Sequence, residues 1–95
     1  MQRITDEMAR DMLRQMIKYD DHVTSCATNL LDAENHDADD AEVWRAIYES
    51  AKACDNIWLD VMRALGVDPT ISVDTGDVSG AIVRRDGKDD FVALD

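Results

Sequence analysis

Apolar side chains recur every three or four residues in two stretches of this chain, and a short acidic segment separates the stretches. The first stripe contains Ala9, Met12, Met16, Tyr19, Val23, Cys26, Leu30 and Ala33. The second stripe contains Trp44, Ile47, Ala51, Cys54, Trp58, Val61 and Leu65. This spacing is typical of a helix that packs lengthwise on another helix. The sequence therefore predicts an antiparallel hairpin of two helices, over residues 6–33 and 40–65.

Capping residues mark the ends of both predicted helices. Thr5 is suited to an N-cap and is followed by two acidic residues, which favour the positive end of a helix dipole. Asp39 or Asp40 is expected to cap the second helix. Gly66 can adopt the left-handed conformation that ends a helix, and Pro69 prevents its continuation.

The segment 70–95 has the alternating pattern of β-structure. Asp86-Gly87 favours a two-residue type I′ turn, which predicts a hairpin of 78–85 with 88–94. That turn fixes three cross-strand pairs, namely Ile82 with Phe91, Gly80 with Ala93, and Arg84 with Asp89. We expect the face carrying Ile82, Phe91, Val78 and Ala93 to pack on the helices. A further short strand can start at Thr70, so the predicted class is α+β, mainly α, in one domain.

The antiparallel register brings together residues whose numbers sum to 77. Tyr19 then meets Trp58, and Cys26 and Cys54 occupy adjacent layers of the seam on opposite helices. Helix axes about 8–10 Å apart would hold these cysteines too far apart for a disulfide, so two free thiols are expected.

Two carboxylates, Asp20 and Asp55, face each other on one flank of this hairpin. We expect both to be solvated. The alternatives are an ion pair with Arg84 or Arg85 from the β-hairpin, or a bound ligand or metal ion, because two close carboxylates cannot both ionise cheaply.

A zinc site is not expected from the histidine and cysteine residues. His22, Cys26 and Cys54 could approach one another, but no fourth zinc ligand is evident, and no metal or cofactor is expected.

The acidic connection between the helices is either a solvated loop or a contact surface for a basic partner. Its residues are Asp32, Glu34, Asp37, Asp39, Asp40 and Glu42. An EF-hand starting at Asp32 would need Gly at position 37 and Glu at position 43, where Asp and Val stand.

Net charge restricts the partners of this chain. With 21 acidic and 10 basic residues, the net charge is −11, which disfavours contact with nucleic acid and anionic membranes and favours a basic protein surface. No signal peptide or membrane-spanning segment is evident, so a cytoplasmic location is expected. A two-helix hairpin leaves apolar surface exposed, so we also expect a homodimer or higher oligomer.

These observations favour a non-enzymatic interaction protein that blocks a basic, nucleic-acid-binding surface. Phage-encoded inhibitors, anti-CRISPR proteins among them, have similar size and charge. The placement of Ile17-Lys18, Leu31, Trp44 and Arg63-Ala64 resembles that in helical-hairpin sponge proteins of phages, although the spacing in the second helix departs from that pattern. This resemblance implies an oligomer that sequesters a small nucleotide. A metal-dependent hydrolase using Asp20 and Asp55 is the third hypothesis.

Overall fold

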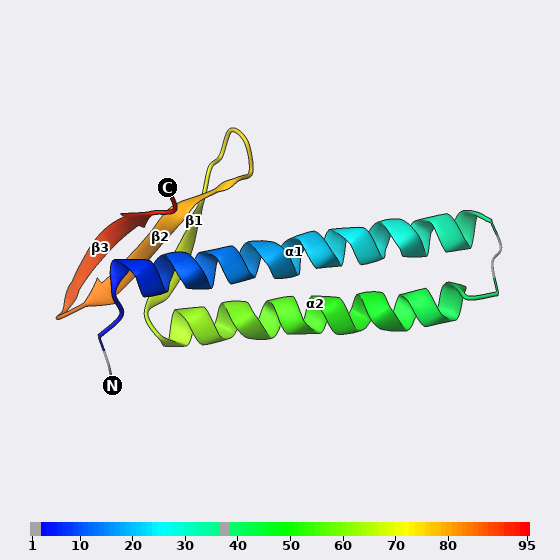
Figure 1. The fold of residues 1–95 in the computed structure, drawn as a ribbon, viewed down its shortest axis with the longest axis horizontal. Helices are drawn as coiled ribbons and strands as arrows, with labels where there is room; N and C mark the ends of the chain where they lie inside the picture. The colour runs from blue at the N-terminus through cyan, green and yellow to red at the C-terminus, as the bar shows by residue number, and fades with distance from the viewer. Residues whose placement is uncertain (1–2, 37–38) are drawn as a thin grey trace.

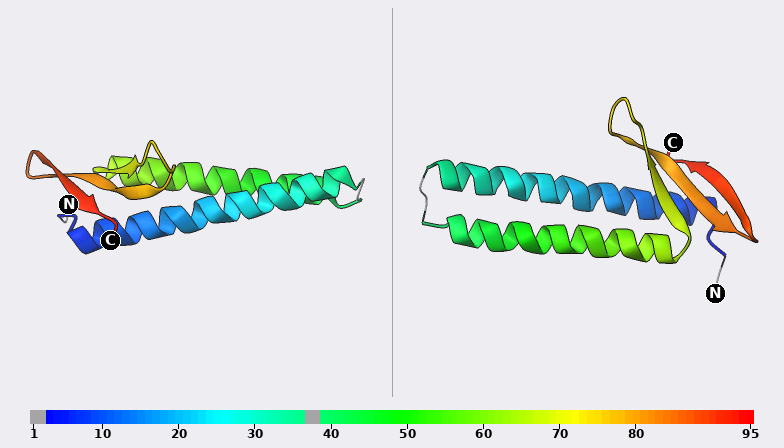
Figure 2. Two further views of the ribbon diagram at one scale, coloured as in Figure 1. Left: turned by 90° about the horizontal axis from the view of Figure 1, so that it is seen from above. Right: turned by 180° about the vertical axis from the view of Figure 1, so that it is seen from behind.

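The computed structural model describes residues 3–36 and 39–95 and contains two helices followed by three strands (Figure 1). In chain order the elements are α1 (Asp6–Asn35), α2 (Ala41–Ala64), β1 (Val67–Ile71), β2 (Val78–Arg85) and β3 (Lys88–Ala93). The helices lie antiparallel and side by side, and the sheet covers the end where α1 begins and α2 ends (Figure 1, Figure 2). The predicted α+β class, mainly α, is confirmed.

The helix ends lie within two residues of the predicted ones. The Thr5 hydroxyl accepts a hydrogen bond of 3.1 Å from the Met8 amide, as expected for an N-cap. Asp40 precedes α2, but its carboxylate accepts a hydrogen bond of 3.2 Å from the Trp44 indole instead of capping the helix. Gly66 follows α2 with a φ of +86°, a conformation that glycine adopts readily because it has no Cβ.

The three strands form one antiparallel sheet in the order β1-β2-β3. Asp86 and Gly87 both have positive φ, 52° and 77°, as a type I′ turn requires. All three predicted cross-strand pairs of β2 and β3 are confirmed. The predicted ion pair also forms, since Nη1 of Arg84 lies 3.4 Å from Oδ1 of Asp89.

The prediction of which sheet face meets the helices was wrong. Ile82 and Phe91 lie on the outer face, where Phe91 is 55% exposed. Of the four residues expected inside, Val78 packs against the core, because a register shift between β1 and β2 lies beside it. The buried residues of the inner face are Ala81, Val83 and Val92.

The start of β1 decides which face is buried. β1 begins at Val67, three residues before the predicted strand, so Gly66 leads the chain directly from α2 into the sheet. Val67 is fully buried and pairs directly with Val83, so these two side chains face the helices together. Pro69 lies within β1 and not before it, which is tolerated because β1 is an edge strand.

The core lies where both helices and the sheet meet. Its largest fully buried side chains are Leu13 of α1, Met62 of α2, Val67 of β1 and Val83 of β2. Together these four side chains attach the sheet to one end of a molecule that measures 54 × 31 × 17 Å. The other end of the hairpin extends beyond the sheet (Figure 2).

The predicted contact of Tyr19 with Trp58 is confirmed. Their ring centroids are 6.0 Å apart, and the rings meet edge to face, which suits the aromatic quadrupoles. The Trp58 indole also donates a hydrogen bond of 3.1 Å to the Met12 carbonyl, which ties the two helices together.

The predicted seam of α2 is confirmed at Trp44, Ala51 and Trp58, which are half-buried or buried, but its other positions within the helix are displaced by one residue. Ile47, Cys54 and Val61 were expected inside but are exposed, so the predicted burial of Cys54 was wrong. The residues that follow them, among them Asp55 and Met62, are half-buried or buried. Because the sheet covers the flank that carries Met62, this rotation of α2 buries more apolar surface there.

Candidate functional site

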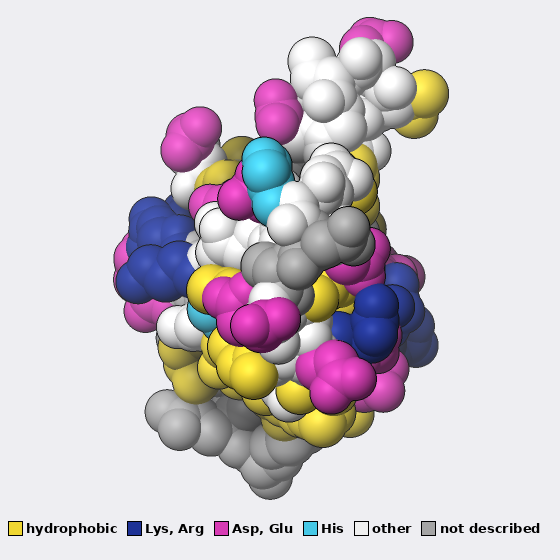
Figure 3. Space-filling view, turned by 90° about the vertical axis from the view of Figure 1, so that its right-hand side faces the viewer, with side chains coloured by type: hydrophobic (Ala, Val, Ile, Leu, Met, Phe, Trp, Pro, Cys, Tyr) yellow, Lys and Arg dark blue, Asp and Glu magenta, His cyan; other side chains and the backbone are white. Residues whose placement is uncertain are grey.

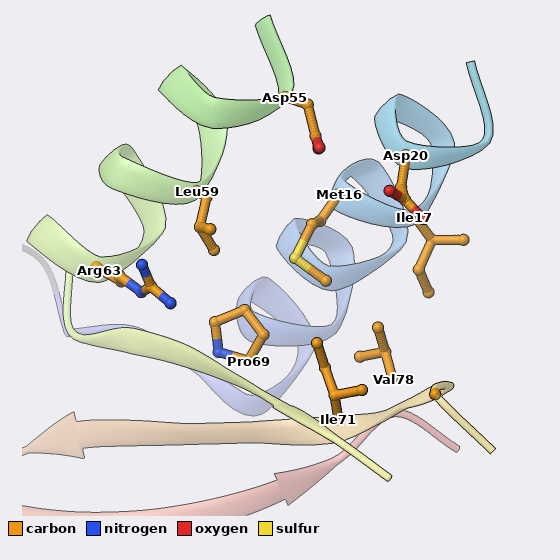
Figure 4. Close-up of a pocket in the computed structure, with 10 residues that line it drawn as sticks. Met16, Ile17, Asp20, Asp55, Leu59, Arg63, Pro69, Ile71 and Val78 are labelled. Atoms are coloured by element: carbon orange, nitrogen blue, oxygen red, sulfur yellow. The ribbon is translucent and has the colours of Figure 1, made fainter. Parts of the chain in front are cut away.

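A pocket of about 220 Å³ lies between the two helices and the β1–β2 side of the sheet (Figure 4). Most of its wall is apolar and is formed by Met16, Ile17, Leu59, Pro69, Ile71 and Val78. The remaining wall residues are Asp20, Asp55, Arg63 and Gly76. The pocket therefore combines an apolar interior with a few charged groups at its margin.

Asp20 and Asp55 come together at this pocket, as the sequence predicts. Asp20 lies seven residues after Leu13, and Asp55 lies seven residues before Met62. Because seven residues make two helical turns, both carboxylates continue the helix flank that carries these two core residues. Figure 4 shows the two carboxylates on one side of the pocket and Arg63 on the other.

Only one of the two carboxylates is exposed, whereas the sequence led us to expect both to be solvated. Asp20 is exposed, whereas Asp55 is half-buried. Burial, followed by the negative charge of Asp20, raises the pKa of Asp55 above its ordinary value of 3.8. Among residues 3–36 and 39–95, neither carboxylate takes part in an ion pair. Arg63 also lines the pocket, but its ion pair is with another residue, since its Nε lies 3.4 Å from Oδ1 of Asp68.

The predicted alternative of an ion pair with Arg84 or Arg85 was wrong. Arg84 pairs with Asp89 on the outer face of the sheet. Nη1 of Arg85 lies 2.6 Å from Oδ1 of Asp6, and its Nη2 lies 3.0 Å from Oδ2 of Asp90. The hydrogen bond from Arg85 lowers the pKa of Asp6. Arg85 therefore connects the start of α1 to the sheet and does not reach the pocket.

The arrangement of the pocket suits a cation with an apolar stem. Two carboxylates at close range attract a guanidinium or ammonium group, and charge-assisted hydrogen bonds are the stronger kind. The apolar wall can contact the aliphatic part of an arginine or lysine side chain. The part of the chain that the structure describes contains no group of three or more His, Cys, Asp or Glu side chains placed to hold a metal ion.

Several carboxylates of the acidic hairpin tip are engaged by neighbouring side chains. Oε1 of Glu34 lies 2.6 Å from Nη2 of Arg45, and Oδ1 of Asp32 lies 3.4 Å from the His36 ring. Asp40 accepts the hydrogen bond from Trp44 described above. Three of the predicted partner-binding carboxylates are therefore engaged within the hairpin.

Two other predicted tip residues, Asp39 and Glu42, are exposed, and Asp37 lies outside the described residues. Figure 3 looks onto this end of the molecule and shows acidic side chains with basic ones on either side. The tip thus carries exposed negative charge, but it is a mixed surface and not a purely acidic one.

The thiols and His22 do not converge into a zinc site in the structure. Cys26 is buried, with its Sγ 3.7 Å from Nε2 of His22, whereas Cys54 is exposed. Both cysteines are free, as expected. Cys54 and His22 instead border a shallow groove between the helices on the flank away from Asp20 and Asp55.

Sequence reasoning found the carboxylate pair but missed the wall that faces it. Pro69, Ile71 and Val78 come from the sheet, which was expected to start later and to present another face. An apolar residue directly after Gly66 was the available sign that the strand starts early.

No family model, curated protein or solved structure matches this chain. Within the described residues, neither helix has a stretch that is both long and apolar enough to cross a lipid bilayer.

Proposed function

We propose that this chain is a non-enzymatic acidic interaction protein of the cytoplasm that binds a basic surface of a larger partner. The pocket beside Asp20 and Asp55 receives an arginine or lysine side chain of that partner. The tip carboxylates, about 20 Å further along α1, add longer-range attraction. By covering a basic surface, such a protein competes with the nucleic acid that the surface would otherwise bind.

The observation that carries the proposal is the uncompensated carboxylate pair at an apolar pocket. The pKa of Asp55 is raised because the carboxyl group is partly buried and lies beside the negative charge of Asp20. A partner's cation would remove that repulsion, so binding and ionisation of the pair support each other. The pocket, at about 220 Å³, is smaller than the roughly 300–1,000 Å³ of most small-molecule sites, which favours a single side chain as its occupant.

Sequestration of a nucleotide is less well supported. The basic residues that could hold an anion do not converge among the described residues. Arg45 pairs with Glu34, and Arg63 pairs with Asp68. Lys52 lies 5.2 Å from the centre of the Tyr48 ring. An anionic ligand at the pocket would also meet two carboxylates.

Binding of a short arginine-rich peptide tests the proposal. The peptide is titrated into the wild type and into the double variant Asp20→Asn/Asp55→Asn by calorimetry at low and high salt. The matched control is Asp21→Asn/Glu49→Gln, which makes the same charge change at exposed positions of the same two helices. We expect about tenfold or greater loss of affinity in the pocket variant, since one hydrogen bond to a charged group contributes roughly 1.5–3 kcal/mol.

The control variant should bind nearly as well as the wild type, and binding of the wild type should weaken as salt rises. An equal loss in both variants would mean that net charge alone attracts the peptide. The pocket would then not be the binding site.

A further inference from the structure

The flank opposite the carboxylate pocket carries a second apolar stripe on α2. Its members recur with alternating spacings of four and three residues over the whole helix and are Val43, Ile47, Ser50, Cys54, Ile57, Val61 and Ala64. Val43 is 58% exposed and Ile57 is 62% exposed, so neither α1 nor the sheet covers this stripe. Because α1 and the sheet cover only one apolar face of α2, this second face has no packing partner within the described residues.

A groove runs beside this stripe, between the two helices. Its lining residues are Tyr19, His22, Ala46, Ile47, Ser50, Ala51 and Cys54, and it holds about 500 Å³. Neither these residues nor the stripe contain a carboxylate, although 21 of the 95 residues of the chain are acidic. Two carboxylates, Glu42 and Asp60, border the stripe near its two ends, because they lie 18 residues and therefore five helical turns apart.

We infer that this face binds a second copy of the chain, with the two α2 helices antiparallel. Two molecules that each carry a charge of −11 repel one another, so their contact is favoured where carboxylates are absent. A basic partner would find no carboxylate to pair with in this groove. The charge distribution therefore selects a like-charged copy for this face and leaves the pocket flank to a basic partner.

The stripe is self-complementary in the antiparallel arrangement. Pairing residues whose numbers sum to 104 places Ile57 of each copy against Ile47 of the other, and Ser50 against Cys54. A two-fold axis makes the same contact twice. The exposed Ile57 side chain of each copy therefore enters the groove of the other copy. The two hairpins then form a four-helix bundle, with the sheets outside it.

The available area is sufficient for such a dimer. The stripe from Val43 to Ala64 is about 32 Å long, and two adjacent helices are about 20 Å wide. This gives roughly 600 Å² per copy and about 1,200 Å² in total, at the lower limit of stable interfaces. We therefore expect a reversible dimer and not an obligate one.

Sedimentation equilibrium of the full chain tests this inference. The wild type should reach twice its chain mass of 10.7 kDa at high concentration, with the dimer favoured by added salt because salt screens the like charges. Ile57→Lys should weaken dimerisation at least about tenfold. Phe91→Lys is the matched control, since Phe91 is also exposed but lies on the outer sheet face.

Three results would overturn the inference. They are a wild type that stays monomeric at every concentration, a dimer that Phe91→Lys disrupts and Ile57→Lys does not, and a dimer that dissociates as salt rises. Circular dichroism of both variants establishes that they remain folded. The outcome is separate from that of peptide binding, because the two surfaces share no residue.

Discussion

Replacing Leu13 with alanine should reduce the free energy of unfolding by about 3–4 kcal/mol. Leu13 is fully buried at the point where α1 meets α2 and the sheet. The substitution removes three carbon atoms from the core, which costs about 2.4 kcal/mol of transfer free energy at ~0.8 kcal/mol each. The cavity left among rigid neighbours adds about 1 kcal/mol or more. The total is a large part of the roughly 5–14 kcal/mol expected for a domain of this size.

The assay is urea unfolding followed by circular dichroism at one fixed protein concentration, because self-association would otherwise alter the apparent stability. Leu31→Ala is the matched control, since Leu31 lies on the same helix but is 59% exposed. It should change the free energy of unfolding by no more than about 0.5 kcal/mol. If both variants lose the same small amount, the sheet does not cover the hairpin as described.

Three further predictions concern single residues. Asp55→Asn should raise the free energy of unfolding near pH 7 but not near pH 3. The raised pKa of Asp55 means that its ionised form destabilises the fold above pH 3.8, and this destabilisation disappears as the pH falls. Equal stabilisation at both pH values in denaturant titrations would contradict this prediction. Gly66→Ala should destabilise the fold by about 1–2 kcal/mol, measured by the same titration, because a Cβ at a φ of +86° is strained and would lie 3.3 Å from the Arg84 carbonyl oxygen. In dilute protein, a thiol reagent should label Cys54 at once and Cys26 only on unfolding, and rapid labelling of both would show that Cys26 is not buried.

Periodicity predicted the helical hairpin and the contact of Tyr19 with Trp58, because both follow from spacing along one chain. The Asp86-Gly87 turn likewise fixed the register of β2 and β3, since a two-residue turn leaves no freedom in the pairing. Helix periodicity and the two-residue turn are both patterns of short stretches of sequence, so they can be recognised without knowing how the sheet packs on the helices.

The side of the sheet that meets the helices could not be predicted in this way. Two apolar faces were available in β2, and the choice depends on where β1 starts and on the contact of Val67 with Val83. The rotation of α2 also depends on the position of the sheet. The sheet covers the flank of α2 that carries Met62, so Met62 is buried while Ile47 and Cys54 are exposed. The carboxylate pair was predicted because helix spacing sets it, whereas the opposite wall of its pocket depends on the sheet.

Carbon-detected nuclear magnetic resonance of the aspartate carboxyl groups shows whether Asp55 receives a basic side chain of a partner. The pKa of Asp55 is measured in the free protein and in the presence of the arginine-rich peptide, with Asp6 as the internal reference. We expect a pKa for Asp55 above 3.8 in the free protein that falls when the peptide binds, and a pKa for Asp6 that stays lowered throughout. An Asp55 pKa at or below 3.8 in the free protein, or one that the bound peptide leaves unchanged, would show that Asp55 does not form the binding site.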